Sequence, residues 1–550
     1  MIVRDIHLAK ALLVESNPML RSIAAAQLRD IGVGHIATAG RIKEARLLIE
    51  RQTFDIVICN REFEGCSDNG QDLLDELRRE NQLPHGTVFL MVTSKVSYHA
   101  VVELAEAALD GILVRPYSGA LLAARLLEAR KRKRELAPIL HALDSGDTEA
   151  ALALALKRFQ DKQPYATYCG RLVAELLLRM GRPLEARKIF ERLASKNAIW
   201  ARLGMARADI AAGDAAQARQ MIAAVLAEDP RSADAHDLVG RILVEQCDFD
   251  GALAEYRQAA DLTPGCLLRA QHAGALAFYQ GQGADALSLL ERALGLGVQS
   301  KLFDALSLLL LAFLRFDNGD LPGVASMREQ LAGYQERFPE SRRLARFGQA
   351  AEVLVSLQGG ARESAMQTLA ALARQVGEDD FDLEAANMLL ALSARMPAGL
   401  LPAAGQDELI DRIAMRFCVS KAMTEVLVAS ARRAEPAHSL IRRAQARVAA
   451  LAEEAMETSL SGDPSGAATR LLEVGEQSLN AKLLEMAGLI ARRHAATLPD
   501  AEALVARAAA TLKRSCLAMN HIAGIQRSGR SPGGLQLRVR AEDRTDAATA

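Results

Sequence analysis

Aromatic residues are scarce in this chain: they make up 4% of its 550 residues, and tryptophan occurs only once. A β-sandwich would need more aromatic and β-branched side chains. Alanine, leucine and arginine, which favour helices, fill long stretches instead. We therefore expect a mostly helical protein. At about 150 residues per domain, the length predicts three or four domains or one long repeat array.

The chain also lacks an excess of either charge. Lys plus Arg number 67 and Asp plus Glu 68, for a net charge of −1. A dedicated polyanion binder would be strongly basic. One basic cluster, RKRKR at residues 130–134, could bind nucleic acid or an acidic partner. Because no recognisable DNA- or RNA-binding module accompanies it, we interpret it as a solvated helix end whose cations complement the helix dipole, and expect no nucleic-acid partner.

No apolar run has the length of a membrane span. The longest, around residues 305–314, is far shorter than the roughly 18–20 residues that a span requires. Asp5 and Glu15 lie where a secretory signal would be apolar. Seven scattered cysteines without a CxxC pair predict free thiols and no structural zinc. We therefore expect a cytoplasmic protein without a membrane partner.

Residues 1–134 alternate strand-length apolar runs with helix-length amphipathic runs, which predicts one α/β domain. Five strands alternating with five helices imply a parallel sheet that is covered on both faces. We expect strands at 11–15, 35–38, 55–60, 87–92 and 111–114, and helices at 18–31, 42–51, 72–81, 98–108 and 118–134. Sites in such sheets lie at the carboxyl ends of the strands. The residues placed there are Glu15, Ser16, Asn60, Thr93 and Arg115.

Four segments carry a resemblance to a known family: LLVESNP at 12–18, FDIVICN at 54–60, FLMVTS at 89–94 and ILVRPY at 112–117. With the strand order, they make residues 9–134 resemble the receiver domain of two-component response regulators. The resemblance implies a flavodoxin-like fold, and an aspartate ending the third strand that is phosphorylated. It also implies Mg²⁺ bound by that aspartate and an acidic pair after the first strand. A Thr or Ser after the fourth strand and a Lys after the fifth would hold the phosphoryl oxygens.

The sequence departs from this family at most of those positions. Glu15 keeps the first acid and Thr93 is kept, but Ser16 stands where the second acid is expected and Asn60 at the phosphoacceptor. A carboxamide is a far poorer nucleophile and brings no charge to a metal. Arg115 replaces the lysine, which is not a neutral exchange. These changes predict a degenerate phosphorylation pocket, argue against Mg²⁺, and suggest no other cofactor.

Two interpretations of this pocket stay open. In the first, Glu15, Thr93 and Arg115 form a structural polar cluster in which Arg115 pairs with Glu15, and the receiver acts without phosphorylation. In the second, a carboxylate in the loop after the third strand accepts the phosphoryl group instead. The candidate acceptors are Glu62, Glu64 and Asp68.

Residues 136–340 repeat with a period of 34: Gly240 and Gly274 have this spacing, and so have Ala252 and Ala286. The offsets resemble the tetratricopeptide (TPR) pattern, in which small residues let two helices approach and a proline ends the second helix. We expect five to six helical pairs, four of them clear. The signature packing positions are Trp200, Leu203, Gly204, Ala218, Gly240, Ala252, Tyr256, Pro264, Gly274 and Ala286.

One unit departs from this spacing. Trp200, Leu203 and Gly204 follow the WxxLG order that the TPR family favours, and we expect Trp200 in the core. The distance from Gly204 to Ala218 is two residues longer than in the next unit. We therefore expect an extended turn or first helix there.

The remaining chain is less informative. Residues 341–514 stay helical by period without a clear 34-residue signature, and predict a degenerate TPR-like extension. Residues 515–550 have the composition of a disordered tail. No catalytic motif is found, around Cys418 or elsewhere, so we expect no enzyme and assign no catalytic or metal-binding residue.

Together these patterns favour a bacterial signalling adaptor, a degenerate receiver joined to a TPR solenoid whose concave face binds one or more proteins. A signalling partner could also bind the receiver. The alternative is a phosphorelay regulator that is phosphorylated at a substitute carboxylate and acts through the TPR region. A chaperone-type carboxylate clamp is disfavoured, because it needs asparagines on first helices, and only Asn197 and Asn318 occur between 136 and 340.

Overall fold

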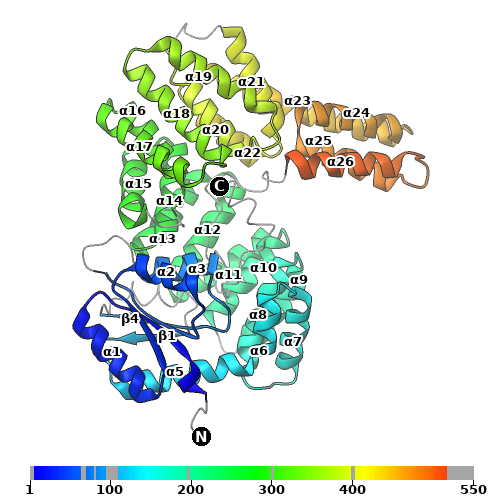
Figure 1. Ribbon diagram of the computed structural model, residues 1–550. Helices are drawn as coiled ribbons and strands as arrows, with labels where there is room; N and C mark the ends of the chain where they lie inside the picture. The colour runs from blue at the N-terminus through cyan, green and yellow to red at the C-terminus, as the bar shows by residue number, and fades with distance from the viewer. Residues whose placement is uncertain are drawn as a thin grey trace.

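The computed structural model describes residues 5–63, 70–79, 82–94, 110–194, 198–298, 303–397 and 403–516. A five-stranded α/β domain at the N-terminus is followed by a long succession of packed helices (Figure 1). This is the predicted fold class, a parallel-sheet domain followed by an all-α solenoid-like region. Within the described ranges, no helix combines the length and the apolarity that crossing a membrane requires.

The sheet is parallel throughout, with strand order β2-β1-β3-β4-β5. All five predicted strands are present, each within about one residue of its expected bounds. β3 and β4 are buried along their whole length and apolar up to their last residues, Asn60 and Thr93, as is typical of parallel strands with helices on both faces. The strands are β1 (Lys10–Val14), β2 (His35–Ala39), β3 (Ile56–Asn60), β4 (Val88–Thr93) and β5 (Gly111–Val114).

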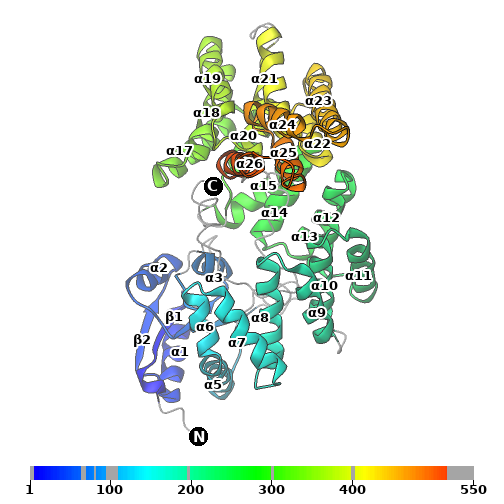
Figure 2. The same ribbon diagram turned by 90° about the vertical axis from the view of Figure 1, so that its right-hand side faces the viewer.

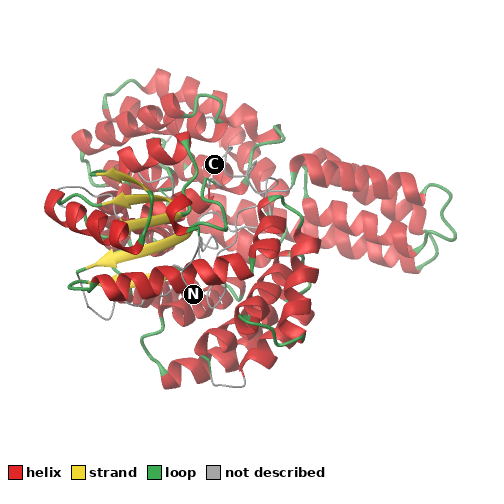
Figure 3. Ribbon diagram, turned by 60° about the horizontal axis from the view of Figure 1, so that its bottom comes forward, coloured by secondary structure: helices red, strands yellow, loops and turns green. Residues whose placement is uncertain are grey.

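Helices cover both faces of this sheet (Figure 3). On one face, α1 (Pro18–Ile31) and α5 (Gly119–Glu135) share a core with alternate strand residues. On the other face, α2 (Ile42–Arg51) and α3 (Gly70–Arg79) pack against the intervening residues. The predicted helix at 98–108 lies outside the described residues.

The helical region begins as packed pairs of consecutive helices. Helices α10, α12 and α14 start 34 residues apart, as the repeat period predicts. The helices of this array are α6 (Ala137–Asp144), α7 (Thr148–Gln160), α8 (Ala166–Arg179), α9 (Pro183–Leu193), α10 (Ile199–Ala211), α11 (Ala215–Glu228), α12 (Ala233–Glu245), α13 (Phe249–Leu262), α14 (Leu267–Tyr279), α15 (Gly283–Gly297), α16 (Leu306–Asp317), α17 (Leu321–Arg337), α18 (Arg342–Gln358) and α19 (Arg362–Arg374).

The expected extension near Gly204 is wrong. Helices α10 and α12 both have 13 residues, and Ala206, not Gly204, stands 34 residues before Gly240. Ala206 is fully buried. Gly204 instead faces the preceding unit, where a Cβ would lie 2.4 Å from the ring of Phe190. Trp200 is half-buried and packs against the hydrophobic core of the first repeats, with the Arg171 guanidinium 4.9 Å from its ring centroid.

The other signature positions pack as the TPR pattern predicts. Ala218, Ala252, Ala286, Tyr256 and Leu203 are buried, and the exposed Pro264 follows the end of α13. A Cβ at Gly274 would lie 2.8 Å from Leu290. Small residues on first helices therefore receive large side chains from second helices.

The approach of Gly240 to Tyr256, within one helical pair, gives a testable prediction. A Cβ at Gly240 would lie 2.5 Å from the Tyr256 ring, so G240A should destabilise the array by about 1–3 kcal/mol through overpacking. Thermal unfolding monitored by Trp200 fluorescence measures this. The control is G333A on α17, where no atom lies within 4 Å of the new Cβ and helix propensity predicts a gain of up to about 1 kcal/mol. An equal loss of stability in G240A and G333A would show that the close approach to Tyr256 is not the cause.

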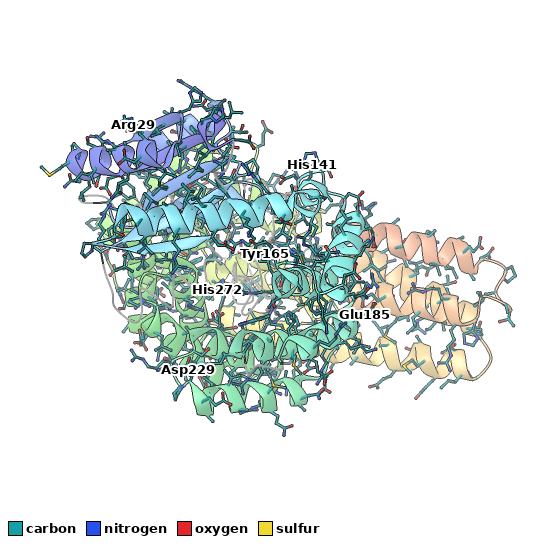
Figure 4. All side chains as sticks on the ribbon, turned by 90° about the horizontal axis from the view of Figure 1, so that it is seen from below. Arg29, His141, Tyr165, Glu185, Asp229 and His272 are labelled. Atoms are coloured by element: carbon teal, nitrogen blue, oxygen red, sulfur yellow. The ribbon has the colours of Figure 1, made fainter. Side chains whose placement is uncertain are left out.

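The basic cluster at residues 130–134 lies at the end of α5, as expected, but some of its cations also join the two parts of the chain. Only Leu136 separates α5 from α6. Lys133 Nζ donates to the carbonyl of His85 at 2.6 Å, and the guanidinium of Arg132 lies over the ring of Tyr168 on α8. Tyr165, at the start of α8, and α6 lie close to α5 (Figure 4). The cations of α5 therefore contact both the sheet domain and the first helices of the array.

The last four helices, within residues 435–515, form a bundle that projects from the array (Figures 1 and 2). The described residues between 383 and 515 form seven helices, in agreement with the helical period of this region. They are α20 (Leu383–Ser393), α21 (Ala403–Phe417), α22 (Lys421–Ser430), α23 (Glu435–Leu460), α24 (Pro464–Ser478), α25 (Ala481–Arg493) and α26 (Ala501–Ser515). The six described cysteines are free thiols, and Cys66 lies outside the described residues.

Candidate functional site

The residues selected from the sequence meet at the carboxyl edge of the sheet. Glu15 follows β1, Asn60 ends β3, Thr93 ends β4 and Arg115 follows β5. Parallel pairing brings these strand ends together, since Asn60 lies opposite Val92 on β4. The half-buried Ser16 follows Glu15 in the loop before α1. The structure therefore groups all five predicted residues in one place.

Arg115 and Glu15 form an ion pair, as the first interpretation of the pocket predicts. Arg115 Nη2 donates to Glu15 Oε2, and the other carboxylate oxygen accepts the backbone N–H of Asn17 at 2.9 Å. Glu15 is only 2% exposed. Both oxygens of this buried carboxylate are therefore engaged within the chain.

Asn60 is buried and turned toward its own loop. Its Nδ2 donates to the carbonyl of Glu62 at 2.7 Å, while among the described residues nothing donates to its Oδ1. A Cβ at Gly70 would lie 2.2 Å from the Asn60 carbonyl oxygen, so only glycine lets α3 begin this close to β3. The neighbouring Cys59 thiol has its pKa raised well above the usual range, mainly by burial and secondly by the Glu15 charge.

Glu62 reaches into the pocket beside Thr93. The Thr93 hydroxyl donates to Glu62 Oε1 at 2.8 Å, and the Ser94 N–H lies 3.5 Å from Oε2. Sequence reasoning named Glu62 as a candidate phosphoacceptor but missed this contact. The available signal was an acid two residues past β3, next to the hydroxyl that ends the adjacent strand. Glu64 and Asp68 lie outside the described residues.

The charges of the pocket are thus matched by groups of the chain itself. The Glu15 carboxylate is bound to a guanidinium, and the Glu62 carboxylate accepts a hydroxyl. Within the part of the chain that the structure describes, no three His, Cys, Asp or Glu side chains converge as metal ligands do. The arrangement is a buried, internally bonded polar cluster.

These observations define a flavodoxin-like parallel α/β domain with a polar site at its carboxyl edge, followed by helical repeats. A family model described as a response regulator receiver domain matches residues 11–127, and a tetratricopeptide repeat model matches residues 177–242. Through its N-terminal domain, the chain belongs to the response regulator receiver family.

Two chemotaxis proteins support this assignment. Chemotaxis protein CheY-3 of Vibrio cholerae is 30% identical over 117 residues, which cover 88% of that protein and 21% of this chain. Chemotaxis protein CheY of Pseudomonas aeruginosa is 30% identical over 113 residues, which cover 89% of that protein and 20% of this chain. With its TPR repeats, the chain is a two-component signalling protein that carries a protein-interaction region.

Proposed function

We propose that this protein is a cytoplasmic bacterial signalling adaptor. Its receiver domain works without phosphorylation at the usual position, and its TPR array binds one or more proteins through its concave face. The observation that carries the proposal is the Arg115–Glu15 ion pair beside a carboxamide at Asn60. A guanidinium of the chain neutralises the pocket where receivers would use a metal ion.

The residues at this edge do not fit the Mg²⁺ that the receiver family implies. Hard divalent cations bind carboxylate, carbonyl and water oxygens. Both Glu15 oxygens are engaged by Arg115 and Asn17, and Ser16 supplies no charge. Asn60 directs its NH₂ group at the Glu62 carbonyl, which occupies that oxygen as well. Among the described residues, Asn60 Oδ1, unlike both Glu15 oxygens, accepts no hydrogen bond, and one neutral amide oxygen does not replace the carboxylates that Mg²⁺ prefers.

The alternative is phosphorylation at a substitute carboxylate. Glu62 is the described candidate, and it lies within the pocket. Its Oε1 already accepts the Thr93 hydroxyl, and the Arg115 guanidinium at the same edge of the sheet is bound to Glu15. An incoming phosphoryl group would need both contacts to break, which favours the adaptor without phosphorylation.

The array offers a rigid scaffold for a partner. Buried ion pairs connect successive first helices: Arg207 on α10 donates to Glu175 on α8 at 3.0 Å, and Arg269 on α14 binds Asp234 and Asp237 on α12 at 2.9 and 2.8 Å. These contacts hold neighbouring units in register. A preorganised surface loses less entropy on binding, which supports a protein-binding role.

Affinity capture tests this proposal. The full chain is used as bait in lysate of the source cells, with and without acetyl phosphate and Mg²⁺, and bound proteins are identified by mass spectrometry. We expect the same partners in both conditions. N60D serves as a comparison bait that restores an aspartate at the end of β3. Partners that bind the wild-type chain only with the phosphodonor, or no reproducible partner at all, would contradict the proposal.

A further inference from the structure

A carboxylate of the chain itself binds the hydroxyl that ends β4. The Thr93 hydroxyl, on a side chain that is 1% exposed, donates to the Glu62 carboxylate at 2.8 Å. The Ser94 amide lies at the longer distance of 3.5 Å from the second oxygen. One carboxylate thus faces the last residue of β4 and the first residue after it.

The backbone around Glu62 is fixed from three sides. The Asn60 side chain binds the Glu62 carbonyl at 2.7 Å, the Arg61 N–H donates to the Val92 carbonyl at 2.8 Å, and the Gly70 N–H donates to the Arg61 carbonyl at 2.9 Å. The carboxylate is therefore held beside β4 by hydrogen bonds that do not involve its own side chain. Such preorganisation lowers the entropic cost of the contact.

The chemistry of the contact makes it a strong one. Hydrogen bonds to ionised groups are shorter and stronger than those between neutral groups, and burial strengthens them further. The Arg115 guanidinium, at the same edge of the sheet, is bound to Glu15. The Thr93 hydroxyl has a charged acceptor supplied by the chain itself.

We infer that Glu62 is an internal latch. Its carboxylate holds the Thr93 hydroxyl and the Ser94 amide in one arrangement at the carboxyl end of β4, so this end of the sheet keeps a single conformation without any external ligand. The inference rests on the proposed function, because a phosphoryl group at this site would have to displace Glu62. Asn60 serves the latch as a positioning residue through the Glu62 carbonyl.

Hydrogen exchange of the full chain, read by mass spectrometry on peptides spanning residues 88–94, tests the latch. We expect E62A and T93V each to speed exchange there by roughly tenfold to a hundredfold, the loss of one hydrogen bond to a charged group. The double variant should exchange no faster than the faster single variant, because both changes break the same contact. E62Q, which keeps an acceptor but no charge, should lie between wild type and E62A.

The matched control is E44A. Glu44 on α2 also accepts a backbone N–H near this edge, that of Gly40 at 2.8 Å, but it does not contact β4. E44A should leave exchange in residues 88–94 unchanged. The latch would be overturned if residues 88–94 exchange at the wild-type rate in E62A. It would also be overturned if the effects of E62A and T93V add in the double variant.

The proposed function is checked separately in the same samples. Acetyl phosphate and Mg²⁺ are added to the wild-type chain, and exchange in residues 88–94 should not change. A change there that E62Q abolishes would contradict the adaptor proposal, and with it the claim that the latch stays closed without an external group. The exchange rates of E62A without the phosphodonor decide independently whether the Glu62–Thr93 contact stabilises the end of β4.

Discussion

Replacing Arg115 with methionine is expected to lower the free energy of unfolding of the receiver domain by about 3 kcal/mol. The variant removes the partner of a buried carboxylate, and an uncompensated buried charge is strongly destabilising, by about 3–5 kcal/mol. We take the lower end of this range, because the Arg115 side chain is 21% exposed, whereas the Glu15 side chain is 3% exposed. Hydrogen exchange of the strand peptides as a function of denaturant measures the loss within this domain.

Two comparison variants make this prediction specific. R134M breaks the exposed Arg134–Asp5 ion pair of the same domain and should cost no more than about 1 kcal/mol. The double variant E15Q/R115M removes both charges and should recover much of the loss, since replacing both members of a buried pair is often close to neutral. A loss in R115M no larger than that in R134M would show that Glu15 does not depend on the guanidinium.

Replacing Arg416 with methionine is expected to have the largest effect in the helical region, about 3–5 kcal/mol. The side chain is 2% exposed and donates to three carbonyls, those of Val376, Glu378 and Ser515, at 2.6, 2.8 and 3.2 Å. Each buried carbonyl left without a donor costs about 1–3 kcal/mol. Ser515 ends α26, so this helix should exchange amide hydrogens much faster in the variant.

The matched control for Arg416 is R442M. Arg442 on α23 binds Glu425 at 2.8 Å, but its side chain is 54% exposed. Exposed ion pairs contribute about 0–1 kcal/mol, so R442M should leave α26 protected. If amide exchange in α26 is as slow in R416M as in the wild-type chain, Arg416 does not connect this helix to α21.

Much of the fold follows from local patterns. The five strands were predictable because buried parallel strands are short, apolar and β-branched, as IVICN in β3 is. Strand order then placed Glu15, Asn60, Thr93 and Arg115 at one edge, and opposite charge predicted the Glu15–Arg115 pair. The repeat helices were predictable because alanines and glycines recur every 34 residues where two helices touch.

The predictions that were wrong or incomplete concern contacts that sequence spacing does not determine. The WxxLG match at Trp200 led to a wrong alignment of this unit. Gly204 packs on Phe190 of the preceding unit, and the buried Ala206 occupies the position equivalent to Gly240. The cations at 130–134 are ordinary for a helix end, and their spacing does not show that Lys133 binds the His85 carbonyl or that Arg132 lies over the Tyr168 ring. Whether Glu62 reaches Thr93 depends on side-chain direction after β3, which no periodicity predicts.

The central claim is that the chain's own side chains take the place of metal and phosphoryl group in the receiver pocket. Intact-mass spectrometry of the full chain after incubation with acetyl phosphate and Mg²⁺ tests it most directly, with a receiver domain that keeps the aspartate at the end of its third strand as the positive control. We expect that the wild-type chain gains no phosphoryl group, whereas the control does. A phosphoryl group on the wild-type chain that disappears in E62Q, or in the triple variant E62Q/E64Q/D68N, would contradict it.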